Sequence, residues 1–245
     1  MGKILIAAET AGLRDQMQRN LSSKHEIACA QDGAQAWNLV TTMEPELLVL
    51  DMELPGMDGI TFLKQMYSAG YHPAVIVVAR LLSDYAIDTL GEMGVKYLMR
   101  KPCKPQNVAD RAEDILCHRY KHDKRIHEGT LRIMEELGIP SHLHGAKYLP
   151  VAAALMNRNP SQYITKELYP AVGKRFNTDG NRVERSIRHA IAQGFDSGRQ
   201  DAWIAYFGQT PEGAPVRPKN AAFILRIVEL LNENARKQAD VTVFE

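Results

Sequence analysis

Short apolar runs alternate with helical patterns through the first half of the chain. Leu13, Met17 and Leu21, for example, recur at intervals of four residues, as on one face of a helix. The apolar runs predict five strands, at residues 3–8, 26–30, 47–50, 74–79 and 96–99. Nearly continuous apolar strands between helices are typical of a parallel sheet that is covered on both faces. The pattern therefore predicts an α/β domain with a doubly wound, five-stranded parallel sheet.

The second half of the chain shows helical patterns and no strand-like alternation. Helices are predicted at residues 130–137, 148–156, 164–176, 182–194, 201–207 and 221–234. Between the halves lies a highly charged segment without a clear apolar period, which is typical of a linker or of a frayed helix end. We therefore predict the α/β domain over residues 1–118, a linker over 119–128 and an all-helical domain over 129–245.

The composition is that of a globular protein. Of the 245 residues, 45% are hydrophobic and 24% are charged, which excludes collagen-like and wholly disordered chains. No apolar run approaches the ~18 residues of a membrane span, and the first run is too short for a signal peptide. We therefore expect a cytoplasmic protein that does not associate with membranes. The three cysteines form no CxxC motif, which excludes a disulfide framework and a zinc site.

The charge is divided unequally between the halves. Residues 1–118 carry 11 Lys and Arg against 15 Asp and Glu, a net charge of −4. Residues 119–245 carry 19 against 14, a net charge of +5. An acidic half joined to a basic half is typical of a regulatory module coupled to a module that binds a polyanion. Chance variation between two ordinary domains is the alternative.

Three charged residues follow predicted strands, at the sheet edge where parallel sheets bind ligands. Glu9 follows the first strand, Asp51 the third and Lys101 the fifth. Asp51 is suited to act as a nucleophile that forms an acyl phosphate, and Lys101 to neutralise the charge of the phosphoryl group. Because Mg²⁺ prefers carboxylate oxygens, the candidate metal ligands are Glu9, Asp51 and Glu53. Each residue alone is compatible with a plain strand end or turn, but together they favour phosphoryl transfer.

A helix, a short turn and a second helix are predicted at residues 165–176, 177–180 and 181–192. This order is the geometry that places a second helix in the major groove of DNA. The exposed face of the second helix is rich in arginine, which can donate hydrogen bonds to phosphates and to guanine. It also carries a glutamate that can accept a hydrogen bond from cytosine N4. A merely solvated helix face is the alternative. The candidate DNA-binding residues are Lys174, Asn181, Arg182, Glu184, Arg185, Arg188 and His189.

Residues 50–59, LDMELPGMDG, resemble the phosphoacceptor signature of bacterial response-regulator receiver domains. Residues 100–103, RKPC, resemble the lysine–proline loop of the same domains, in which the peptide before proline is usually cis. The resemblance covers residues 2–118 and implies a flavodoxin-like fold and a bound Mg²⁺. It also implies that Asp51 accepts phosphate from a phosphodonor protein or a histidine kinase.

Several positions depart from the receiver pattern. Ala8 stands where receivers carry the first of two acids, which implies weak Mg²⁺ binding. Ala79 replaces a Ser or Thr that hydrogen-bonds the phosphoryl group, and Leu98 replaces an aromatic switch residue. The phosphoacceptor and the lysine are thus present, whereas the residues that report phosphorylation are altered.

Three short motifs within residues 174–191, KRFNT, RVER and IRHAI, resemble the effector domain of the stage 0 sporulation protein A family. This resemblance spans residues 130–232. It implies that Glu184, Arg185 and Arg188 contact bases, that the DNA site is a TGTCGAA-like box, and that the protein binds double-stranded DNA as a homodimer.

We therefore interpret the chain as a two-component or phosphorelay transcription regulator of the sporulation-initiation type, and not as an enzyme. Asp51 is its phosphoacceptor and residues 181–192 are its recognition helix. The alternative is a pseudo-receiver, in which Arg80 either pairs with Asp51 or Glu9 or points to solvent, and DNA binding is independent of phosphorylation. A third, weaker interpretation is an aspartyl-phosphate phosphatase with Glu53 as general acid, although this side chain is one methylene longer than the usual Asp.

Overall fold

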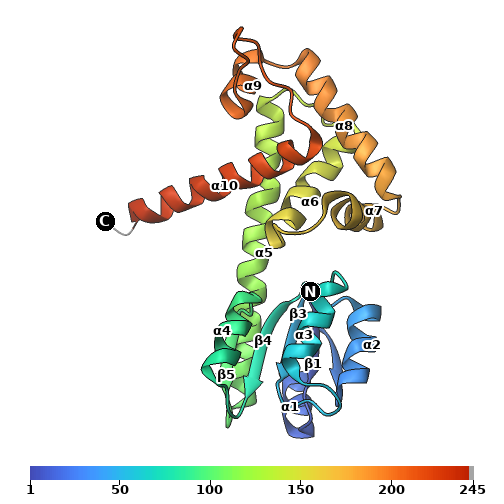
Figure 1. Cartoon of the computed structure of the whole chain (residues 1–245), viewed down its shortest axis with the longest axis vertical. Helices are drawn as coiled ribbons and strands as arrows, with labels where there is room; N and C mark the ends of the chain where they lie inside the picture. Colours follow the sequence, from blue (N-terminus) through green and yellow to red (C-terminus); the bar gives the residue numbers. More distant parts are fainter. Residues whose placement is uncertain (243–245) are drawn as a thin grey trace. The chain divides into compact units, whose positions relative to one another are not determined.

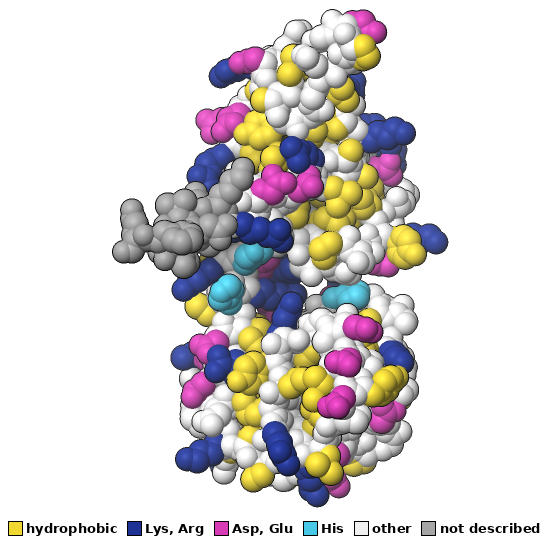
Figure 2. Space-filling view, turned by 60° about the vertical axis from the view of Figure 1, so that its left-hand side comes forward, with side chains coloured by type: hydrophobic (Ala, Val, Ile, Leu, Met, Phe, Trp, Pro, Cys, Tyr) yellow, Lys and Arg dark blue, Asp and Glu magenta, His cyan; other side chains and the backbone are white. Residues whose placement is uncertain are grey.

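The computed structural model describes residues 1–242, with the side chains described as far as residue 236. The chain divides into two compact units, Met1–Tyr120 and Lys121–Glu245 (Figure 1). Within the described residues, no helix is long and apolar enough to cross a membrane. On the face shown in Figure 2, Lys and Arg side chains occur over both units, interspersed with Asp and Glu. The unequal charge of the two halves therefore does not form one continuous patch on this face.

The first unit is a five-stranded parallel sheet in the order β2-β1-β3-β4-β5, flanked by helices (Figure 1). This order confirms the predicted flavodoxin-like α/β fold. The strands are β1 (Lys3–Ala7), β2 (Glu26–Ala30), β3 (Leu47–Asp51), β4 (Ala74–Ala79) and β5 (Tyr97–Arg100). The helices between them are α1 (Ala11–Leu21), α2 (Gly33–Met43), α3 (Gly59–Ser68) and α4 (Asp84–Glu92).

Side chains that alternate along each strand enter two separate cores, which explains why the strands are apolar without interruption. In β1, Ile4 and Ile6 belong to the core that also includes residues of α1 and of α5 (Pro105–Glu136). Leu5 and Ala7 point the other way, into the core formed with residues of α2 and α3. No helix is predicted from the sequence at the position of α4. Leu90 is the one buried side chain of this helix, so α4 shows no repeat of buried apolar positions.

The predicted linker over residues 119–128 is helical in the structure. It lies inside α5 (Pro105–Glu136), which also contains all but the last residue of the separate helix predicted at residues 130–137. Ile126 is the one buried apolar side chain of residues 119–128. Long polar side chains make the other packing contacts, and hydrophobic periodicity does not detect these. Arg119 Nη1 donates to the main-chain oxygen of Glu46 at 2.5 Å, and Arg125 donates to the side chain of Asn232 at 2.8 Å. The boundary between the two compact units falls within this helix, after Tyr120.

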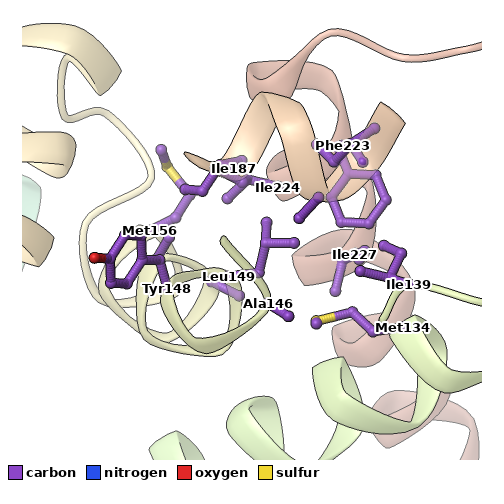
Figure 3. Packing of buried hydrophobic residues seen from close by; sticks show 14 of the residues in the cluster. Met134, Ile139, Ala146, Tyr148, Leu149, Met156, Ile187, Phe223, Ile224 and Ile227 are labelled. Atoms are coloured by element: carbon purple, nitrogen blue, oxygen red, sulfur yellow. The ribbon is translucent and has the colours of Figure 1, made fainter. Parts of the chain in front are cut away.

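The second unit is all-helical in its regular structure, as predicted. Its elements after α5 are α6 (His144–Arg158), a π-helical turn η1 (Ile164–Leu168), α7 (Tyr169–Arg175), α8 (Gly180–Ser197), α9 (Gln200–Phe207) and α10 (Asn220–Thr242). The single helix predicted at residues 164–176 is thus two elements, η1 and α7. Figure 3 shows Leu149 of α6, Ile187 of α8 and Ile224 of α10 entering one shared core. That core holds α8 in place from its apolar side.

Candidate functional site

Asp51 is the last residue of β3, and its side chain is 1% exposed. One carboxylate oxygen, Oδ1, accepts hydrogen bonds from Lys101 Nζ at 2.6 Å and from the backbone N–H of Glu53 at 3.1 Å. The other oxygen, Oδ2, is buried and has no hydrogen-bond partner among the described residues. A buried carboxylate with one tethered and one unpartnered oxygen is suited to accept a further electrophile or cation at Oδ2.

Lys101 reaches Asp51 because β3 and β5 lie on either side of β4 and both end at the same edge of the sheet. The backbone N–H of Lys101 donates to Ala79 at 2.8 Å, which fixes the start of the loop after β5. The peptide between Lys101 and Pro102 is cis, as the resemblance to receivers implied. Lys101 Nζ also lies 3.3 Å from Glu53 Oε2, so one ammonium group bridges two carboxylates.

Arg80 forms a contact that the sequence did not predict. Its Nε lies 3.3 Å from Glu53 Oε2, whereas the expectation was a pair with Asp51 or Glu9, or a side chain in solvent. The guanidinium remains largely in water, since the side chain is 71% exposed. Glu53 is therefore shared by two cations, Arg80 and Lys101, at the entrance to the buried Asp51.

The three predicted metal ligands do not come together. Glu9 is exposed, and the structure contains no cluster of three or more His, Cys, Asp or Glu within its described residues that could hold a metal ion. Arg14 Nη1 donates to the main-chain oxygens of Ala8 and Glu9, which places a cation directly after β1. Among the described residues, Asp51 Oδ2 is thus the one buried carboxylate oxygen without a partner, and this donor set does not fit a three-carboxylate Mg²⁺ site.

Ala79 and Leu98, the two positions at which the chain departs from the switch residues of receivers, both carry apolar side chains. Ala79 is buried at the end of β4 and has no group that could donate to a phosphoryl oxygen. Leu98 in β5 packs against the core that includes residues of α2 and α3. Neither side chain offers a polar group whose position could report the state of Asp51.

In the second unit, α7 and α8 form the predicted helix, short turn and helix. The turn is tight because Gly173 has no side chain: a Cβ atom there would lie 2.5 Å from the main-chain oxygen of Thr178. Asn177 adopts a left-handed conformation with φ of 52°, a conformation that Asn tolerates better than most residues. The side chain of Asp179 accepts a hydrogen bond from the backbone N–H of Arg182 at 2.8 Å and so caps α8.

Helix α8 is amphipathic. Its buried face consists of Val183, Ile187, Ala190, Ile191 and Gly194. On the opposite face the predicted DNA-binding side chains are exposed, with Glu184 partly buried, and Lys174 is exposed in the last turn of α7. The predicted residues of α8 therefore form one surface on the side of the helix away from the core, and α8 extends to Ser197, five residues beyond the predicted recognition helix.

Two contacts restrain Glu184 at the centre of this surface. Its carboxylate accepts a hydrogen bond from Arg188 Nη2, one turn later in the helix. Its main-chain oxygen accepts from the side chain of Asn220, the first residue of α10, at 3.0 Å. Beside them lies a pocket of about 490 Å³ whose lining includes the cations of Arg188, Arg217 and Lys219. The sequence did not single out Arg217, Lys219 or Asn220 as site residues, because they lie outside the helix–turn–helix pattern.

Each half of the chain matches a known protein family. Residues 4–113 match the family described as response regulator receiver domain. Residues 130–231 match the family described as sporulation initiation factor Spo0A C terminal.

The receiver half is also similar to solved structures. The N-terminal domain of an uncharacterized protein from Wolinella succinogenes is 24% identical, with 50% of this chain and 99% of that chain covered and a TM-score of 0.46. A CheY-like receiver domain protein from Methanospirillum hungatei JF-1 is 19% identical, with 50% and 98% covered and a TM-score of 0.46. A DNA-binding response regulator of the LuxR family from Staphylococcus aureus is 20% identical, with 47% and 98% covered and a TM-score of 0.43.

The two family matches follow one another along the chain and agree with the two compact units. The first unit has the parallel sheet of a receiver, with an aspartate and a lysine at its edge. The second unit is the helical region that carries the Spo0A match. The chain is therefore a response regulator of the Spo0A type, with a receiver domain followed by a sporulation-type DNA-binding domain.

Proposed function

We propose that this chain regulates transcription at sporulation initiation by placing α8 in the major groove of DNA, with residues 181–192 as its recognition helix. The observation that carries the proposal is the amphipathic character of α8. An apolar stripe fastens the helix to the core, and the opposite face presents Arg182, Arg185 and Arg188 to solvent. A helix held in this way can enter the groove without a change in its own packing.

Each exposed side chain has a chemical role in this proposal. Arg185 and Arg188 would donate to guanine O6 and N7, and Glu184 would accept from cytosine N4. Lys174, at the end of α7, would contact a backbone phosphate and so add affinity without sequence preference. The preferred site would be a TGTCGAA-like box, bound by a homodimer.

We propose further that Asp51 is the phosphoacceptor. Its Oδ2 would attack the phosphorus of a phosphodonor protein or histidine kinase, forming an acyl phosphate as the bond from phosphorus to the donor breaks. Lys101 Nζ, already 2.6 Å from Oδ1, would neutralise the added charge. Receiver domains generally bind Mg²⁺ for this step, and we propose that this one binds it weakly, because Glu9 does not join Asp51 and Glu53.

A second candidate is a pseudo-receiver, in which phosphorylation changes DNA binding little. It is favoured by the cations around the acceptor, since Lys101 bonds to Asp51 and Glu53, and Arg80 to Glu53. It is favoured also by Ala79, which cannot bond to a phosphoryl oxygen. A modification shifts an equilibrium between two states only by the difference in its interactions with them, and here few such interactions are available.

The phosphatase interpretation has the least support. The residue that would serve as general acid, Glu53, forms ion pairs with both Lys101 and Arg80. The family matches are to regulatory and DNA-binding domains.

The experiment that tests the proposed function measures binding of the full chain to fluorescent duplexes by anisotropy. One duplex contains a TGTCGAA box and the other has the same composition in scrambled order. We expect tighter binding to the box, because Arg185 and Arg188 read its bases. Equal affinity for the two duplexes would contradict α8 as a sequence-reading helix.

A further inference from the structure

A second pocket lies on the α6 side of α8, beside the surface predicted to read DNA. It has a volume of about 480 Å³ and lies between the first turn of α6, the turn after α7 and one side of α8. Its lining consists of His144, Lys147, Tyr148, Phe176, Thr178, Arg182 and Ser186. Apart from Arg182, none of these residues belongs to the predicted DNA-binding set.

A close approach of two helices builds this pocket. A Cβ atom on Gly145 would lie 2.0 Å from the main-chain oxygen of Ser186, so α6 contacts the backbone of α8 directly at this point. The ring of Tyr148 packs against Phe176, with ring centroids 4.8 Å apart, and this contact joins α6 to the turn after α7. The pocket is therefore shaped by rigid elements.

The chemistry of the pocket suits an anion with several oxygen atoms. Its lining combines two permanent cations, Lys147 and Arg182, with the imidazole of His144, and it contains no Asp or Glu. No ion pair joins Lys147 or Arg182 to a carboxylate within the part of the chain that the structure describes. Ser186 and Thr178 add hydroxyl groups, which can donate to anionic oxygens.

The hydroxyl group of Thr178 provides an independent indication that this pocket binds a ligand. Its hydroxyl oxygen is buried and has no hydrogen-bond partner among the described residues. A buried hydroxyl without a partner costs free energy, which a ligand oxygen at the pocket would recover. The first turn of α6 adds to the attraction for an anion, since no side chain caps its N-terminus and the helix has 15 residues.

We propose that this pocket binds a phosphate of the DNA backbone beside the groove that α8 enters, a proposal that rests on the proposed function. Arg182 makes the connection, because it belongs both to the exposed face of α8 and to the pocket lining. His144 and Lys147 are exposed, so a phosphate that remains part of a duplex can reach them. The first turn of α6 thereby sets the position of α8 on the duplex, without reading sequence.

The first test compares Lys147→Gln with Lys121→Gln, which removes the same charge from an exposed lysine of α5 that lines neither of the pockets beside α8. Affinities for the box and scrambled duplexes are measured by anisotropy from about 50 to 200 mM salt. Loss of one phosphate contact should reduce the slope of log affinity against log salt by about 0.9, equally for both duplexes. We expect this change for Lys147→Gln and none for Lys121→Gln. Equal slopes for the parent and Lys147→Gln would overturn the proposal.

The second test uses Thr178→Val, which removes the hydroxyl and keeps the branched shape of the side chain. Because the hydroxyl is uncharged, we expect both duplexes to bind about threefold to tenfold more weakly with an unchanged salt slope. Unchanged affinity would show that the buried hydroxyl meets no phosphate, and would overturn the site as described. Circular dichroism of each variant confirms that the helices are intact.

Inorganic phosphate distinguishes a DNA phosphate from a free anion as the occupant. It is titrated into the full chain while the backbone amide signals of Thr178 and Ser186 are followed by NMR. Saturation below about 1 mM, together with unchanged duplex binding by Lys147→Gln, would assign the pocket to a free anion and overturn the proposal. If the parent binds neither duplex, the proposed function itself fails. If the parent binds the box and Lys147→Gln behaves like Lys121→Gln, only the pocket proposal fails.

Discussion

Lys101 Nζ lies 2.6 Å from Asp51 Oδ1, and this contact joins the ends of two strands that are not neighbours in the sheet. It gives the buried carboxylate a cationic partner supplied by the chain itself. It also occupies one oxygen and leaves Oδ2 without a hydrogen-bond partner among the described residues. We therefore expect this contact to affect the stability of the receiver domain and its response to phosphorylation.

Breaking this pair from one side should destabilise the receiver. Lys101→Met leaves the carboxylate of Asp51 buried and unpaired, and we expect a loss of about 3 kcal/mol, the low end for a buried pair because Lys101 is partly exposed. The double variant Lys101→Met/Asp51→Asn removes the stranded charge as well and should recover much of that loss. Urea unfolding of the full chain, followed by far-UV circular dichroism, measures both. A double variant no more stable than Lys101→Met would contradict a direct pair.

Phosphorylation should change DNA binding only modestly. With Ala79 and Leu98 at the switch positions, we expect a phosphodonor and Mg²⁺ to raise affinity for the box duplex by less than tenfold, or about 1.4 kcal/mol. Asp51→Asn under the same conditions is the control. A rise of tenfold or more that Asp51→Asn abolishes would show that the receiver is an ordinary switch.

Base-reading and phosphate-binding residues should differ in their effect on selectivity. We expect Arg185→Ala and Arg188→Ala each to lose about 1–3 kcal/mol on the box duplex and much less on the scrambled one. Lys174→Ala should weaken both duplexes alike. Anisotropy titrations of all three variants against both duplexes make the comparison, and an equal loss on both for Arg188→Ala would exclude a base contact by that residue.

Gly145 should tolerate no side chain. In Gly145→Ala the new methyl group would lie 2.0 Å from the main-chain oxygen of Ser186, so α6 and α8 must separate. We expect a loss of stability of about 3 kcal/mol, measured by chemical denaturation. Gly12→Ala is the matched control, since a Cβ atom there meets nothing within 4 Å and alanine favours a helix by about 0.5–1 kcal/mol. A variant Gly145→Ala as stable as the parent would refute the close approach.

The cap of α3 should make part of the stability depend on pH. Hydrogen bonds from the side chain and backbone of Thr61 hold the pKa of Asp58 below its usual value. A lowered pKa in the folded state means that this stabilisation is present above the unfolded value of about 3.9 and is lost as the pH falls through the folded one.

Asp58→Ala should therefore cost about 1 kcal/mol near neutral pH, and less in acid. Asp58→Asn keeps a capping side chain that does not titrate, so it should stay near the parent at pH 7 and lose less stability on acidification. Urea unfolding of the three proteins across this pH range tests the prediction. A cost of Asp58→Ala that does not shrink in acid would contradict an ionised cap.

The sheet and the amphipathic character of α8 could be predicted because local periodicity determines them. Strands buried on both faces are apolar without interruption, as β1 and β3 are, and a helix fastened by one face repeats its apolar residues, as α8 does at Val183 and Ile187. The same reasoning failed where packing uses polar side chains. Residues 119–128 continue α5 because Arg119 and Arg125 bond to other elements, and no apolar repeat records such contacts.

The sequence by itself determined the α/β sheet, the helical second half, and which strand ends carry Asp51 and Lys101. The tertiary structure alone decided how the charged side chains are paired and which of them share a pocket. Arg80 binds Glu53 and not Asp51 or Glu9, and Lys147 lines a pocket with Arg182, 35 positions away in the chain. The physical reason is that an ion pair or a pocket depends on distances between elements that fold together from distant parts of the chain, whereas a hydrophobic period depends only on neighbours.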